Sequence, residues 1–102
     1  MNIFSEIPTD LKDEIFEDII NTDNLKIERI VSYGHTSPKS GWYESENSEW
    51  VIVLKGEASL SFENSKDIKL NEGDYINITA FTKHKVSWTL PNAETVWLAV
   101  HY

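Results

Sequence analysis

Two hydrophobic periods divide the chain near residue 24. In residues 9–20 (TDLKDEIFEDII) apolar side chains recur every three or four positions, a spacing that predicts an amphipathic α-helix. These positions are Leu11, Ile15, Phe16, Ile19 and Ile20. Thr9 or Asp10 is suited to cap the start of the helix, and Pro8 prevents its extension backward. We therefore expect a short helical segment within residues 1–24.

From residue 25 onward the period shortens to two, which is typical of half-buried β-strands. Turn-forming residues separate the runs, among them the loop GHTSPKSG. The expected strands cover residues 25–33, 50–54, 57–63, 67–70, 75–80, 84–90 and 95–102. About seven or eight short strands without interleaved helices predict a small antiparallel barrel or jelly roll. We expect one all-β domain over residues 1–102, with the barrel in residues 25–102.

Composition and charge narrow the classes of partner. The net charge of −8 disfavours binding to nucleic acids and to anionic membranes. The longest apolar runs, such as Trp50–Leu54, are too short to cross a bilayer, and there is no cysteine for disulfides or thiolate metal sites. The opening MNIFSEIPTD lacks the basic start and apolar core of a signal peptide. A cytoplasmic protein is the expectation.

Two strands begin with ionisable side chains on an apolar face. His84 shares its face with Val86 and Trp88, and Glu49 shares its face with Val51, because residues two apart point the same way. An inward carboxylate needs a cation, a hydrogen-bond donor or a proton. A histidine at such a position is also compatible with a satisfied core residue, and that alternative stays open.

Glu44 precedes Glu49 in the stretch WYESENSEW and could approach the same point. Two carboxylates and His84 are plausible ligands for a divalent metal, or a general acid–base pair. The alternative is a solvated hairpin tip. We expect the candidate pocket to be lined by Trp42, Tyr43, Trp88, Trp97 and His101, although aromatics in a small barrel usually pack the core. The roles of His35 and His101 are not determined by the pattern.

The spacing among Glu49, Gly56, Gly73 and His84 resembles the two motifs of the cupin superfamily. Glu49 is followed by six residues and then Gly56, and His84 lies eleven residues after Gly73. The superfamily motifs run roughly G-x5-H-x-H-x3/4-E-x6-G and G-x5-P-x-G-x2-H-x3-N. The resemblance covers about residues 30–102 and identifies the chain as similar to a small, single-domain, conserved-barrel cupin with degenerate motifs.

The chain departs from the motifs at the metal-binding histidines. Trp42 and Glu44 occupy those positions with the four-residue spacing, and Tyr43 and Ser45 occupy them with the three-residue spacing. The proline, second glycine and asparagine of the second motif are also absent. Half of the usual ligands are therefore missing unless Glu44 replaces one histidine.

The resemblance implies a barrel with a small-molecule pocket that binds one divalent ion, such as Fe, Mn, Zn or Ni, through Glu44, Glu49 and His84. An enzyme of this kind would be a metal-dependent dioxygenase or isomerase. The alternative is a metal-free ligand-binding, regulatory or assembly barrel without catalytic activity. Cupins commonly form homodimers through their sheet edges, and the apolar run Trp50–Leu54 fits such burial.

Overall fold

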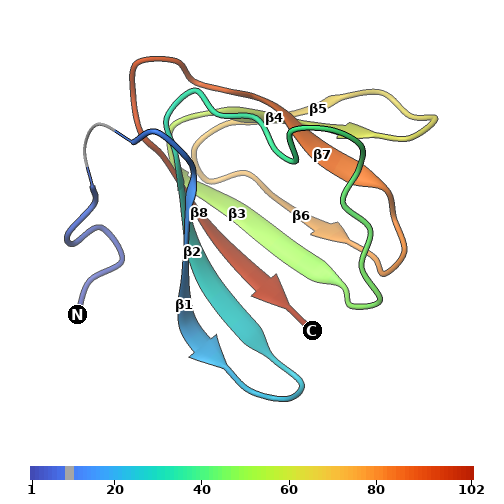
Figure 1. Cartoon of the computed structure of the whole chain (residues 1–102), viewed down its shortest axis with the longest axis horizontal. Coiled ribbons are helices and arrows are strands. Elements are labelled where there is room, and N and C mark those ends of the chain that lie inside the picture. The colour runs from blue at the N-terminus through green and yellow to red at the C-terminus, as the bar shows by residue number, and fades with distance from the viewer. Residues whose placement is uncertain (9–10) are drawn as a thin grey trace.

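The computed structural model describes residues 1–8 and 11–102, and these form two antiparallel sheets that face each other (Figure 1). The strands are β1 (Ile15–Asn21), β2 (Lys26–Ser32), β3 (Glu49–Lys55), β4 (Ala58–Phe62), β5 (Ile68–Leu70), β6 (Tyr75–Ile78), β7 (His84–Thr89) and β8 (Thr95–His101). The larger sheet has the order β1-β2-β8-β3-β6, and the smaller has the order β5-β4-β7. The prediction of an all-β antiparallel barrel is confirmed.

Strand register builds the core from rows of inward-facing side chains. Trp97 of β8 lies directly opposite Ile30 of β2 and Val53 of β3. Ala58 and Leu60 face this row from the smaller sheet and belong to the same buried cluster. Since burial of each large apolar side chain contributes about 1.5–3 kcal/mol, this row is a main source of stability. Along the same strands the inward face then changes from apolar to charged, and that end forms the candidate site.

The predicted N-terminal helix is wrong. Residues 15–21 form the edge strand β1, which pairs along its length with β2, with a bulge between Asp18 and Ile20. Arg29 of β2 holds this strand, because its guanidinium donates to Glu17 Oε1 at 2.6 Å and to the Ser5 carbonyl at 2.6 Å. Tertiary pairing therefore overrode a helical spacing that was only 12 residues long. The proposed caps Thr9 and Asp10 lie outside the described residues.

In the described parts of the chain no helix is long and apolar enough to span a bilayer. The outer face of β3 leaves Trp50, Ile52 and Leu54 half-buried. Homodimer formation through this run stays a prediction.

Gly56 and Gly73 both adopt positive φ, at 91° and 88°, but differ in the space around them. A Cβ at Gly56 would lie 2.8 Å from the Glu94 carbonyl oxygen, whereas nothing lies within 4 Å of one at Gly73. We expect Gly73→Ala to lower the free energy of unfolding by about 1–2 kcal/mol through backbone strain alone. Gly56→Ala should cost about 2–4 kcal/mol because overpacking adds to the strain.

Urea denaturation of both variants measures the difference, with an unchanged dependence on urea concentration as the control for a similar unfolded state. Equal losses for the two glycines would contradict the close packing of Gly56 against the chain before β8.

Candidate functional site

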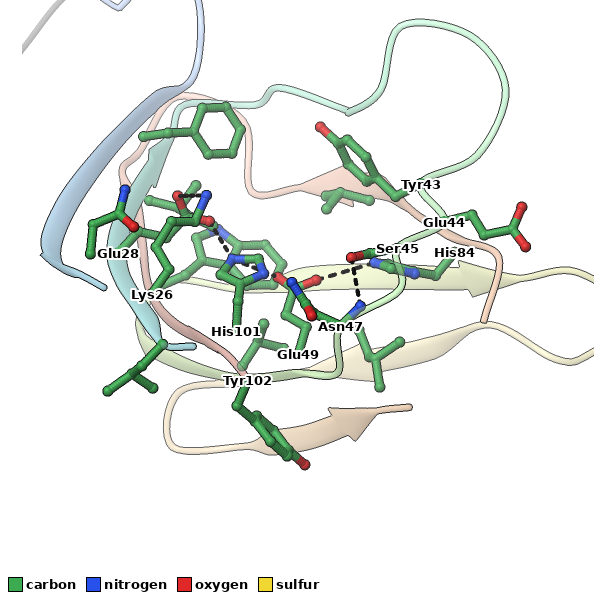
Figure 2. Close-up of a pocket in the computed structure, with 18 of the residues that line it drawn as sticks. Lys26, Glu28, Tyr43, Glu44, Ser45, Asn47, Glu49, His84, His101 and Tyr102 are labelled. Atoms are coloured by element: carbon green, nitrogen blue, oxygen red, sulfur yellow. Dashed lines mark hydrogen bonds and ion pairs between the residues drawn. The ribbon is translucent and has the colours of Figure 1, made fainter. Parts of the chain in front are cut away.

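A cavity of about 790 Å³ lies between the two sheets, where their inner faces become polar. Its apolar part includes Ile30, Val51, Leu60, Val86 and Trp97. Its ionisable part includes Lys26, Glu28, Glu49, His84 and His101, all of which appear in Figure 2. The cavity therefore combines an apolar interior with a compact group of charged side chains, which is typical of small-molecule sites.

Glu49 is the first residue of β3 and reaches two imidazoles. Its Oε1 lies 3.3 Å from Nε2 of His84, which belongs to the opposite sheet. Its Oε2 lies 3.9 Å from Nε2 of His101, the residue directly across from it on β8. The structure thus brings together Glu49 and His84, the two residues that match the motif ligands, although they are 35 positions apart.

His84 is buried and its orientation is fixed by the backbone. Its Nδ1 lies 2.8 Å from the carbonyl oxygen of Thr82, so Nδ1 is the donor and Nε2 faces Glu49. Burial is the largest influence and lowers the pKa of His84. The hydrogen bonds to Glu49 and to the Thr82 carbonyl, with the charge of Glu49, outweigh burial and raise the pKa above 6.5.

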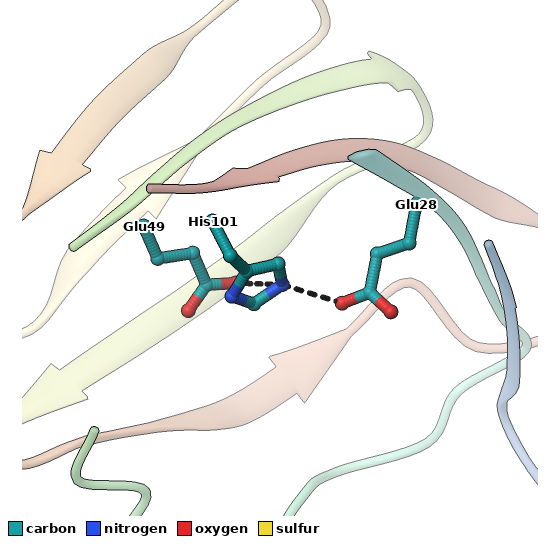
Figure 3. Close-up of side chains that lie close together, drawn as sticks. All are labelled: Glu28, Glu49 and His101. Carbon is teal, nitrogen blue, oxygen red and sulfur yellow. Dashed lines mark hydrogen bonds and ion pairs between the residues drawn. The ribbon is translucent and has the colours of Figure 1, made fainter. Parts of the chain in front are cut away.

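His101, the second imidazole near Glu49, also pairs with Glu28, and this pair was not predicted. His101 Nε2 lies 2.7 Å from Oε1 of Glu28, and Figure 3 shows the His101 ring between the carboxylates of Glu28 and Glu49. Glu28 is only 5% exposed, and its other oxygen lies 3.6 Å from Nζ of Lys26. The sequence carried a signal for Glu28, because it shares a strand face with Ile30.

The other predicted ligand, Glu44, does not join this group. Its residue borders the cavity, but its carboxylate points away from Glu49 and His84 (Figure 2). Tyr43 instead pairs with His84 through reciprocal backbone hydrogen bonds of 2.8 and 3.0 Å. Neither Tyr43 nor Glu44 therefore takes the place of a motif histidine beside Glu49.

The predicted aromatic lining divides into two groups. Tyr43, Trp97 and His101 line the cavity. Trp42 and Trp88 are not among the lining residues: Lys85 Nζ lies 4.5 Å from the ring of Trp42, and Trp88 is 36% exposed. The structure thus places these two tryptophans where they contact lysines rather than a ligand.

The remaining histidine, His35, ties loops together. Its Nδ1 accepts from the backbone N–H of Tyr33 at 2.8 Å, and its Nε2 lies 3.0 Å from the carbonyl oxygen of Lys12. It therefore serves local structure away from the cavity.

Trp97 carries an unpaired polar atom that is buried behind the cavity wall. The residue is 2% exposed, and its Nε1 has no hydrogen-bond acceptor among the described residues. A buried donor without an acceptor costs about 1–3 kcal/mol. Trp97 lines the cavity, but its Nε1 atom is itself buried, so this cost belongs to the core and not to a donor that the cavity exposes.

The donor set fits a divalent ion. One ligand atom each from Glu28, Glu49 and His101 lies within 4.8 Å of the others, in the part of the chain that the structure describes. Carboxylate and imidazole ligands suit Zn²⁺, Mn²⁺, Fe²⁺ and Ni²⁺. The Nε2 atom of His84 borders the same group through Glu49.

A family model described as a cupin domain matches residues 30–101. A solved structure from Ralstonia eutropha JMP134, provisionally assigned as a mannose-6-phosphate isomerase, is 40% identical, with a TM-score of 0.94 over 99% of this chain and 94% of that chain. A Methanocaldococcus jannaschii cupin with a double-stranded β-helix fold is 23% identical, with a TM-score of 0.75 over 94% and 85% of the chains. A Desulfitobacterium hafniense cupin superfamily protein is 17% identical, with a TM-score of 0.77 over 93% and 82%. No curated protein matches the chain.

The raised pKa of His84 predicts a pH-dependent contribution to stability. Because the pKa is higher in the folded than in the unfolded chain, the pair with Glu49 contributes fully below about pH 6.5. This contribution is lost as the pH rises through the folded-state pKa. We expect the free energy of unfolding of the parent to fall, relative to His84→Gln, as the pH rises above about 6.5 and through the folded-state pKa.

Urea denaturation in a chelating buffer, at several pH values, measures this difference without metal. Parallel pH profiles for the two proteins would contradict the His84–Glu49 contact.

Proposed function

The chain belongs to the cupin superfamily, and from this premise we propose that it binds a small polar molecule in the cavity between its sheets, with a divalent ion held through Glu49. The observation that carries the proposal is the position of Glu49, whose two oxygens each lie within 4 Å of a different imidazole. His84 matches the histidine of the second motif, and His101 is the neighbour of Glu49 on β8.

The residues have distinct roles in this proposal. Glu49 supplies a carboxylate oxygen, and the Nε2 atoms of His84 and His101 are the available imidazole ligands. The Nδ1–H···O bond to Thr82 fixes the tautomer of His84, as the outer partners of metal-binding histidines generally do. A bound divalent ion would polarise a substrate oxygen or activate water. This chemistry supports an isomerase-type or related reaction.

The apolar part of the lining supports the presence of an organic ligand. The ring of Trp97, with Val51 and Leu60, would pack against the carbon skeleton of such a molecule.

The charge of the lining favours an uncharged molecule over a phosphate ester. Among the residues that the structure describes, five acidic residues line the cavity: Glu14, Asp23, Glu28, Glu44 and Glu49. Lys26 is the single lysine or arginine in the same described lining. A phosphate dianion would therefore meet mostly like charges, even with one divalent ion present. The likeness to the Ralstonia eutropha structure thus suggests a sugar-like ligand, but without its phosphate.

A metal-free binding protein is the second candidate. Both positions of the motif histidines lack imidazole in this sequence, under either spacing. Glu49, His84 and His101 would then hold the ligand through hydrogen bonds alone.

Metal binding is predicted to stabilise the fold. Addition of Zn²⁺, Mn²⁺ or Ni²⁺ to chelator-treated protein should raise the melting temperature, because a ligand at about 100 times its Kd adds about 2.7 kcal/mol. Glu49→Gln should remove most of this rise, since it deletes the shared carboxylate. A thermal-shift titration measures both effects.

The matched control is Glu44→Gln, which also removes one negative charge but at a carboxylate that points away from the group. Its melting temperature should rise with metal as in the parent. The absence of any rise in the parent, or an equal loss in both variants, would contradict the proposal.

Ligand selection is tested with D-mannose and mannose 6-phosphate, a neutral and an anionic form of one sugar. We expect calorimetry to show tighter binding of mannose, because the lining is acidic. Trp97→Phe should lower the free energy of unfolding by less than a buried truncation usually costs, because the unpaired buried donor is removed too.

Tighter binding of the phosphate ester, or no binding of mannose, would contradict the neutral-sugar proposal.

A further inference from the structure

We propose that the divalent ion is displaced from the motif position toward β2 and β8, where Glu28, Glu49 and His101 coordinate it. This inference rests on the proposed function, because it locates the ion that the proposed function requires. Only Glu49 of these three residues matches a motif ligand. The other two come from strand positions that the family motifs do not include.

The distances favour this side of Glu49. The ligand atoms of Glu28, Glu49 and His101 already lie within 4.8 Å of one another, which a single ion between them could bridge after small side-chain movements. Figure 3 shows that the three side chains converge from neighbouring strands. Strand register imposes this, since His101 is paired with Lys26 on one side and with Glu49 on the other.

The opposite side of Glu49 offers fewer ligands. His84 is surrounded there by the ring of Tyr43, with 5.9 Å between centroids, and by the ring of Phe62, with 6.3 Å. Its Nδ1 is occupied by the Thr82 carbonyl. Among the described residues, the motif position therefore brings together one imidazole and one carboxylate, one ligand fewer than catalytic zinc sites usually have.

The charges of the displaced group also favour a cation. Glu28 and Glu49 carry two negative charges, Lys26 carries one positive charge, and a metal-binding His101 is neutral. Glu28 is almost fully buried, and a buried carboxylate is stable only with compensating partners. A divalent ion would supply more of this compensation than Lys26 does.

Lys26 gives the site a distinguishing property. Its Nζ lies 3.6 Å from Glu28 Oε2 and its side chain is 38% exposed, so it competes with a cation for the same carboxylate. Removing its charge should strengthen metal binding at the displaced site, whereas most substitutions near a site weaken it. Lys26 lies beyond His101 from Glu49, so it should matter much less for an ion between Glu49 and His84.

The histidine resonances provide the direct test, because the chain has three histidines. The full-length protein, labelled with ¹⁵N, is titrated with Zn²⁺ and the ring nitrogens are followed by two-dimensional NMR. We expect the Nε2 resonance of His101 to show metal coordination at one equivalent of Zn²⁺. His35, which lies outside the cavity, is the internal reference and should not change. Coordination by His84 without His101 would overturn the inference.

Affinities of variants provide the second test. Calorimetric titration with Zn²⁺ should show at least about 10-fold weaker binding for Glu28→Gln and for His101→Gln, since loss of a ligand or its close partner typically costs 10–100-fold. His84→Gln should lose less affinity than either of these variants, because His84 contacts only Glu49 among the three ligands, and Lys26→Gln should bind about 2–5-fold more tightly. Circular dichroism confirms that each variant is folded.

The outcomes separate the two proposals. If the parent does not bind Zn²⁺, the proposed function fails and the displaced site fails with it. If the parent and His101→Gln bind equally while His84→Gln does not bind, the proposed function holds and the displaced site is overturned. Should Glu28→Gln fail to fold, the NMR titration and the opposite response of Lys26→Gln still decide the position of the ion.

Discussion

The central strand β8 pairs with both β2 and β3, and the candidate site depends on this double pairing. The antiparallel register determines which side chains lie in the same row across the sheet. A slip of one residue would turn every side chain of the strand to the other face. The row through Trp97 buries apolar side chains from three strands. Four residues further along β8, the row through His101 contains Lys26 and Glu49. Packing at one end thereby fixes ionisable groups at the other.

The architecture of residues 25–102 could be predicted because alternation in short strands is a local signal, and the two turn glycines gave the motif spacing. The meeting of Glu49 and His84 was also accessible, since both lie on inward faces and both match the resemblance. The part played by Glu28 and His101 was not accessible in the same way. His101 lies in a strand that is apolar on both faces, so alternation alone did not give its direction. Its partner on β2 is 73 residues away in the chain.

The error at residues 15–20 has a related cause. A spacing of three or four residues fits a helix, yet Ile15, Ile19 and Ile20 are β-branched and favour strands. The deciding interaction is long-range: Arg29 donates to Glu17 from the neighbouring strand and to carbonyls in residues 3–5. A short stretch of sequence does not reveal such a contact, because its partners are far apart in the chain. The contact forms only when residues 15–21 pair with the open edge of the sheet.

The arrangement around Glu49 gives both carboxylates partners without an ion and is compatible with the proposed binding of a cation. Two carboxylates close together would repel each other and disfavour folding if nothing intervened. His101 lies between them and Lys26 approaches from the solvent side, so both carboxylates have partners without an ion. Each of these partners can yield, because a neutral imidazole can turn from hydrogen bonding to coordination and an exposed lysine can move into water. We therefore expect the fold to form without the ion, whereas a zinc finger needs its ion in order to fold. The two motif histidines are absent from this chain, yet Glu49 is not left unpaired. It still contacts His101 on β8 and His84 across the barrel.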